Sequence, residues 1–171
     1  MKRKHGFTLI ELLISLGILS IIITMLLSFF IAEVKTYEAI NWDSNLEFQS
    51  QYVLNFMSRK IMESRKVRHA LRDRKTITDQ TTEQIVTKLS LLYNDQGKCY
   101  IFEKINNKIF YGNGAYNDSA TAELGKYIYE IKVLPFPEGS SLSNAAALKI
   151  TVILSRENHV YEASQLIYFR N

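Results

Sequence analysis

The chain has 171 residues, 47% of them hydrophobic, and a formal net charge of +4. This length suits one domain with a hydrophobic core and argues against a multi-domain enzyme. Lys2, Arg3 and Lys4 supply three of the 21 basic residues, and without them 18 remain against 17 acidic residues. The rest of the chain is therefore nearly neutral, which disfavours a general electrostatic attraction to nucleic acid.

An uncharged apolar segment, Leu12 to Ala32, follows the basic N-terminus. At 1.5 Å a residue it spans about 31 Å, which predicts a membrane-spanning helix. The basic residues before it, with no comparable cluster after it, orient the N-terminus toward the cytoplasm and residues from about 33 outward. A secretory signal peptide is one alternative, but the apolar run is long for one and no A-x-A-like cleavage site follows. The other alternative is a plain anchor for an exported domain of unrelated activity, which leaves Glu11 unexplained.

The residues Gly6-Phe7-Thr8-Leu9-Ile10-Glu11 stand between the basic leader and the apolar segment. In that context they resemble the class III signal of type IV pilins and of the pseudopilins of type II secretion and competence systems. The resemblance implies that a prepilin peptidase removes residues 1–6, cutting between Gly6 and Phe7, and that Phe7 becomes N-methylated. It also implies that Glu11 pairs with the N-terminal amine of a neighbouring subunit inside a filament.

Electrostatics makes this role of Glu11 physically reasonable. Cleavage would create an amine at Phe7, and Glu11 lies four residues later, on the same face of a helix. A carboxylate in the first turn also interacts favourably with the helix dipole. In a filament built of such helices a buried charge is tolerable only when it is paired, so the pair would fix the axial register between subunits.

Beyond the membrane segment the apolar pattern stays helical. Apolar residues recur at spacings near three, four and seven, which predicts that the helix continues over residues 33–75 and packs on a sheet. The section NWDSN (residues 41–45) weakens this helix and is a candidate break. The apolar stripe consists of Leu46, Val53, Leu54, Met57, Ile61, Val67 and Leu71.

Four cations, Arg65, Arg68, Arg72 and Lys75, share one stripe of this predicted helix. Such a stripe is a candidate contact for DNA, for anionic lipid headgroups or for an acidic partner subunit. The alternative is a solvated helix end whose cations suit the negative end of the helix dipole. Nucleic acid is thus a partner that the stripe allows and the overall charge does not favour.

Residues 76–171 carry the alternation and turn signals of an antiparallel β-sheet. The fold class is therefore α+β, with a long N-terminal helix packed on an antiparallel sheet, and this is also the pilin architecture. Gly112-Asn113-Gly114 lacks the third glycine of a dinucleotide fingerprint and is interpreted as the start of a polar loop. The predicted strands cover residues 84–94, 98–105, 108–112, 127–136, 147–155 and 159–171.

Catalytic chemistry is not visible in the sequence. His5, His69 and His159 lie in no recognisable metal or catalytic motif, and Cys99 is expected to be a small buried hydrophobe. We therefore predict no enzyme activity and no cofactor. Asp118 and Glu123 share a loop with amide side chains, which makes calcium an alternative there, but the spacing matches no EF-hand and an ordinary solvated loop is favoured.

The resemblance makes a minor pilin or pseudopilin the expected function, a subunit that initiates or caps a type IV pilus or a secretion or competence pseudopilus. The chain would be anchored in the bacterial cytoplasmic membrane with its C-terminal part outside. The implied partners are the prepilin peptidase, other pilins or pseudopilins, the inner-membrane assembly platform and membrane lipid. The helix segment FMSRKIMESRKV, the later strands and the terminal FRN resemble the larger minor subunits of the J and W types. A filament-borne DNA-binding or adhesive subunit is the alternative.

Overall fold

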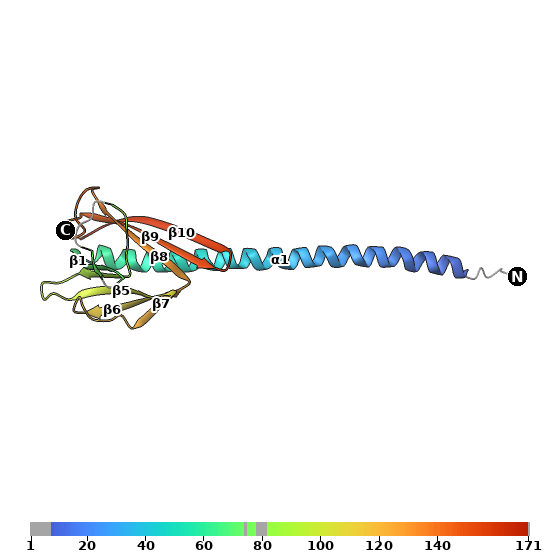
Figure 1. Ribbon diagram of the computed structural model, residues 1–171, viewed down its shortest axis with the longest axis horizontal. Helices are drawn as coiled ribbons and strands as arrows, with labels where there is room; N and C mark the ends of the chain where they lie inside the picture. The colour runs from blue at the N-terminus through green and yellow to red at the C-terminus, as the bar shows by residue number, and fades with distance from the viewer. Residues whose placement is uncertain (1–7, 74, 78–81, 171) are drawn as a thin grey trace. The chain divides into compact units, whose positions relative to one another are not determined.

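The computed structural model describes residues 8–73, 75–77 and 82–170 (Figure 1). It divides into two compact units, residues 1–42 and residues 43–171. One helix, α1 (Leu9–Met62), runs through the described part of the first unit and into the second. The second unit also contains ten described strands, arranged in two antiparallel sheets.

The first sheet has six strands in the order β2-β1-β4-β5-β6-β7. Its strands are β1 (Lys66–Arg72), β2 (Lys75–Thr76), β4 (Lys88–Leu92), β5 (Cys99–Ile105), β6 (Lys108–Gly114) and β7 (Ala122–Lys126). The second sheet has four strands in the order β10-β9-β8-β3. Its strands are β3 (Gln84–Ile85), β8 (Ile128–Phe136), β9 (Ala147–Arg156) and β10 (His159–Tyr168). The predicted α+β class, a long helix with antiparallel sheets, is thereby confirmed.

The buried face of α1 follows the predicted stripe as far as the helix extends. Its buried residues are Leu46, Ser50, Val53, Leu54, Met57, Ser58 and Ile61. The apolar side chains of this set join residues of both sheets in one hydrophobic core. The section NWDSN lies inside α1, so the candidate break there was wrong. Weak helix formers cost only a few tenths of a kcal/mol each, and the buried Leu46 that follows outweighs this cost.

The prediction that the helix extends to residue 75 was wrong, because α1 ends at Met62 and residues 66–72 form β1. A β-bulge explains the error. In the register of β1 against β4, Val67 pairs with Leu91 and His69 with Ser90, so Arg68 is an extra residue without a partner in β4. The extra residue puts the buried Val67 and Ala70 three apart instead of two, and this spacing imitates a helix.

Strand β7 was also missed, since the segment containing it had been interpreted as a polar loop. Its sequence AELGK is short of β-branched residues and only half-buried. Packing explains why it still forms a strand: a Cβ added to Gly125 would lie 2.7 Å from Cγ2 of Val53 in α1. Only glycine therefore allows the backbone of β7 to approach the helix this closely. Asn113 and Gly114, which lie beyond the predicted strand end at Gly112, likewise belong to β6 and not to a loop.

An aromatic cluster lies where the C-terminal end of α1 meets the first sheet. The rings of Tyr93 and Tyr100 stack with centroids 4.2 Å apart, and the Lys60 ammonium lies 4.6 Å from the Tyr100 centroid. The Tyr100 hydroxyl donates a hydrogen bond of 2.9 Å to Glu63, which also accepts one of 2.7 Å from Lys60. Burial, followed by this hydrogen bond and the Glu63 charge, raises the pKa of Tyr100 to about 12. The hydrogen bond from Lys60 is the main cause that lowers the pKa of Glu63.

We predict that Glu63→Gln lowers the pKa of Tyr100 but leaves it above its ordinary value of 10.0, because burial remains. The substitution should also remove the contribution of the Glu63 carboxylate to the free energy of unfolding, and this contribution depends on pH. Because the folded-state pKa of Glu63 lies below 4.5, its contribution is present above that pH and is lost as the pH falls. The checks are a titration of tyrosinate absorbance and urea unfolding between about pH 6 and pH 3. Glu47→Gln, on α1, is the control, and an unchanged titration in the Glu63 variant would contradict the assignment.

Candidate functional site

The described part of α1 begins with a capping box formed by Thr8 and Glu11. The Thr8 backbone N–H donates to Oε2 of Glu11 over 2.9 Å, and the Thr8 hydroxyl donates to the same oxygen over 2.8 Å. The Glu11 backbone N–H donates in return to Oγ1 of Thr8 over 3.4 Å. This reciprocal arrangement satisfies backbone donors that the first helical turn otherwise leaves open. The spacing T-x-x-E signals such a cap, although this cap was not predicted.

The cap turns the Glu11 carboxylate back toward the start of the helix. A negative group in this position is stabilised by the positive end of the helix dipole. The predicted cleavage and methylation positions, Gly6 and Phe7, lie outside the described residues. The candidate assembly site therefore consists, in the described part of the chain, of Thr8, Glu11 and the helix that follows them.

That helix exposes a nearly continuous apolar surface. Among the described residues α1 is the one helix that is long and apolar enough to cross a membrane. Leu9 is 82% exposed and Phe30 is 66% exposed, and the exposed large apolar residues between them range from 47% to 68%. Apolar surface of this extent is expected to be covered by lipid or by other helices, since water is a poor solvent for it.

The polar side chains within this apolar surface satisfy their own hydrogen bonds. Ser15 donates to the carbonyl oxygen of Glu11, Ser20 to that of Gly17 and Thr24 to that of Ser20, over 2.7 to 2.8 Å. Hydroxyls bonded back to their own helix cost little in an apolar environment. In this stretch the Glu11 carboxylate is therefore the group whose burial would require a partner of opposite charge.

The basic residues do not form the predicted helical stripe. Arg65 precedes β1, Arg68 is the bulge residue of β1, and Arg72 and Lys75 face each other across the β1–β2 hairpin. The stripe does not form because α1 ends at Met62, before the first of these cations. The structure therefore separates the four cations into two pairs, one at each end of β1.

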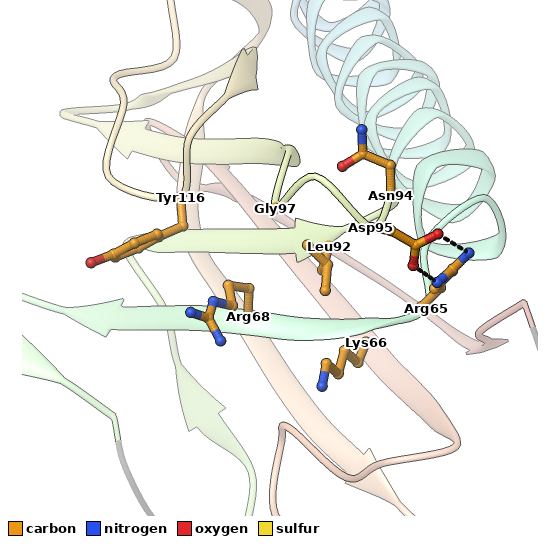
Figure 2. Close-up of a pocket in the computed structure, with 8 residues that line it drawn as sticks. All are labelled: Arg65, Lys66, Arg68, Leu92, Asn94, Asp95, Gly97 and Tyr116. Atoms are coloured by element: carbon orange, nitrogen blue, oxygen red, sulfur yellow. Dashed lines mark hydrogen bonds and ion pairs between the residues drawn. The ribbon is translucent and has the colours of Figure 1, made fainter.

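A surface hollow of about 700 Å³ lies beside the first pair (Figure 2). Arg65 forms a two-pronged ion pair with Asp95 at one side of it, and the Arg68 guanidinium lies 5.8 Å from the centroid of the Tyr116 ring. Most of this lining was not predicted, because β1 was expected to be part of a helix. The complete lining is Arg65, Lys66, Arg68, Leu92, Asn94, Asp95, Gly97 and Tyr116.

Hydrogen bonds to its backbone hold the loop that carries Tyr116 in place. The backbone carbonyl of Tyr116 accepts a hydrogen bond of 2.9 Å from Ser90, and that of Asp118 accepts one of 2.7 Å from the buried Lys88. The Asp118 carboxylate in turn accepts a hydrogen bond of 2.8 Å from the Ala115 N–H. The Tyr116 ring therefore stands on an anchored loop.

The alternative calcium site gains no support from the structure. Asp118 is held by the Ala115 N–H, while Glu123 pairs with Lys108 at 2.6 Å and with Lys126 at 3.7 Å. These lysines lower the pKa of Glu123. Within residues 8–73, 75–77 and 82–170, no group of three or more His, Cys, Asp or Glu is arranged to hold a metal ion.

The other candidate groups lie apart from one another. His159 begins β10 and its Nδ1 lies 2.7 Å from Asp43, whereas His69 is in β1 beside Tyr116. Burial, followed by the charges of Lys88 and Arg68, lowers the pKa of His69. Cys99 is fully buried, as expected, and burial raises the pKa of its thiol, as is typical of an unreactive cysteine. His5 lies outside the described residues.

Comparison with known proteins identifies a family signal at the N-terminus. Residues 1–27 match the family described as the prokaryotic N-terminal methylation motif. The chain therefore carries the N-terminal signal that is typical of type IV pilins and pseudopilins. No curated protein and no solved structure gave a significant match. The matched residues include the capping box and more than half of the exposed apolar segment, so the family signal and the candidate assembly site coincide. The pilin signal implies processing by a prepilin peptidase and assembly with other pilins, and together with the apolar helix it supports membrane anchoring.

Proposed function

We propose that this pilin-type subunit is a minor pilin or pseudopilin that initiates or caps the assembly of a type IV filament. The observation that carries the proposal is the capped Glu11 at the head of an exposed apolar helix, inside the matched signal. In an assembly of such helices the apolar side chains supply non-directional attraction, while a single carboxylate supplies register. The J- or W-type character belongs to the proposal as well.

The proposed organisation follows from this role. Residues 1–6 are a leader, and cleavage between Gly6 and Phe7 followed by methylation produces the mature N-terminus. Residues 7–32 cross the membrane with the N-terminus inside, as the basic leader favours. Residues 43–171 then lie outside and join the filament tip, with the assembly platform and other pilins as partners.

Mass spectrometry of the intact chain tests the proposal. Isolated from membranes that contain a prepilin peptidase, the chain should begin at Phe7 and carry one added methyl group. Gly6→Val should leave the leader attached, because a bulky, β-branched side chain next to the scissile bond adds steric hindrance and removes the backbone freedom that glycine provides. A wild-type chain that still begins at Met1, or is cut beyond Ala32, would refute the pilin-type role.

A second candidate is a binding subunit borne on the same filament, with DNA or an adhesive target as its ligand. The cationic hollow beside β1 is the observation that favours it. This role does not compete with assembly, because the hollow and the apolar helix use different residues.

A further inference from the structure

The hollow beside β1 carries more positive charge than its own acid neutralises. Arg65 is paired with Asp95, but Lys66 and Arg68 have no carboxylate partner within the part of the chain that the structure describes. Both side chains are exposed and extend from β1 (Figure 2). Burial is the main cause that lowers the pKa of His69, and the charges of Lys88 and then Arg68 lower it further. The hollow is thus suited to an anion that contacts two cations.

The bulge in β1 contributes directly to this arrangement. Since Arg68 has no partner in β4, its side chain is not constrained by the ladder and turns toward the ring of Tyr116. Bulges commonly re-aim a side chain in this way beside binding sites. Arg68 therefore connects the charged side of the hollow to its aromatic side.

Tyr116 gives the hollow a flat apolar wall. Tyr116 is 42% exposed, and the hydrogen bonds from Ser90 and Lys88 to its loop hold the loop in place without involving the ring. Leu92 adds a half-buried apolar contact. An exposed ring held beside a guanidinium is the arrangement on which nucleic-acid bases stack.

We propose that this hollow binds a nucleotide, with its phosphate between Lys66 and Arg68 and its base on Tyr116. A lone carboxylate of a partner protein would satisfy the cations but leave the ring and most of the 700 Å³ hollow unfilled, whereas this volume is ordinary for small-molecule sites. The nucleotide is either free or a unit of single-stranded nucleic acid. The proposal rests on the second candidate function and is independent of the assembly role.

The test measures binding of a short fluorescein-labelled oligothymidylate to the full chain in a non-ionic detergent. Two phosphate contacts predict that the logarithm of the binding constant falls with the logarithm of salt with a slope of about −1.4. Lys66→Gln and Arg68→Gln should each reduce the slope to about −0.7. The matched control is Arg72→Gln, which makes the same charge change on the same strand outside the hollow and should leave the slope unchanged.

Tyr116→Leu separates a nucleotide site from a general anion site. The substitution should weaken oligothymidylate about fivefold or more, because one stacked base is lost. Inorganic phosphate should compete equally well with both proteins. Competition by thymidine monophosphate would identify free nucleotide as sufficient, whereas binding of the oligomer alone would identify single-stranded nucleic acid.

Three results would overturn the proposal. The first is no binding of either probe, and the second is equal loss in the Arg72→Gln control. The third is that a polyglutamate peptide binds as tightly as the oligomer and that Tyr116→Leu has no effect on binding. This result would indicate that the hollow is a contact for an acidic protein. None of these results bears on cleavage at Gly6, so failure here stays distinguishable from failure of the pilin-type role.

Discussion

Glu11→Gln should leave the chain processed and membrane-anchored but abolish its assembly with other pilin-type subunits. The cut lies four residues before position 11, so the signal remains accessible to the peptidase. Inside an assembly, however, the neighbour's amine would lose its partner, and one uncompensated buried charge costs about 3–5 kcal/mol. We expect the fraction cross-linked to other pilin-type subunits in its own cells to fall at least about tenfold. Intact mass measures processing in the same samples.

Two controls separate charge pairing from other roles of Glu11. Glu33→Gln makes the same charge change on the same helix and should assemble normally. Thr8→Ala removes the capping hydroxyl but keeps the carboxylate, so it should cost about 1 kcal/mol of local helix stability and leave assembly within a few-fold of wild type. If Glu11→Gln assembles like wild type, or if Thr8→Ala fails as completely, the carboxylate is a helix cap and not an assembly residue.

The fold could be predicted where local pattern and tertiary packing agree. The stripe from Leu46 to Ile61 is buried as the helical period indicates, and strands such as β8 and β9 lie close to their predicted bounds. The end of α1 could not be predicted, because a bulge at Arg68 gives a strand the spacing of a helix. Strand β7 could not be predicted because its cause is a close approach of Gly125 to Val53, which leaves no period in the sequence.

The two candidate sites also differ in how far they could be predicted from the sequence. The signal around Glu11 is contiguous, so its residues are adjacent in the sequence and in the helix. The cationic hollow combines β1, the β4–β5 turn and the loop after β6, which only the sheet order brings together. Arg65 and Arg68 were named from the sequence for a helical stripe, whereas Lys66 and Tyr116 were not named at all.

Met57→Ala should destabilise the second unit more than any change at its surface. Met57 is fully buried on α1, in the core that joins this helix to both sheets, so its removal opens a cavity that neither sheet can close alone. Such substitutions cost about 2–5 kcal/mol, which is a large part of the stability of a small domain. Urea unfolding of the full chain in detergent, followed by the near-ultraviolet circular dichroism of its tyrosines, measures the change. Tyr52→Ala, on the exposed face of the same helix, should cost less than about 1 kcal/mol. Equal losses in the two variants would mean that helical propensity, and not packing of α1 between the sheets, holds this unit together.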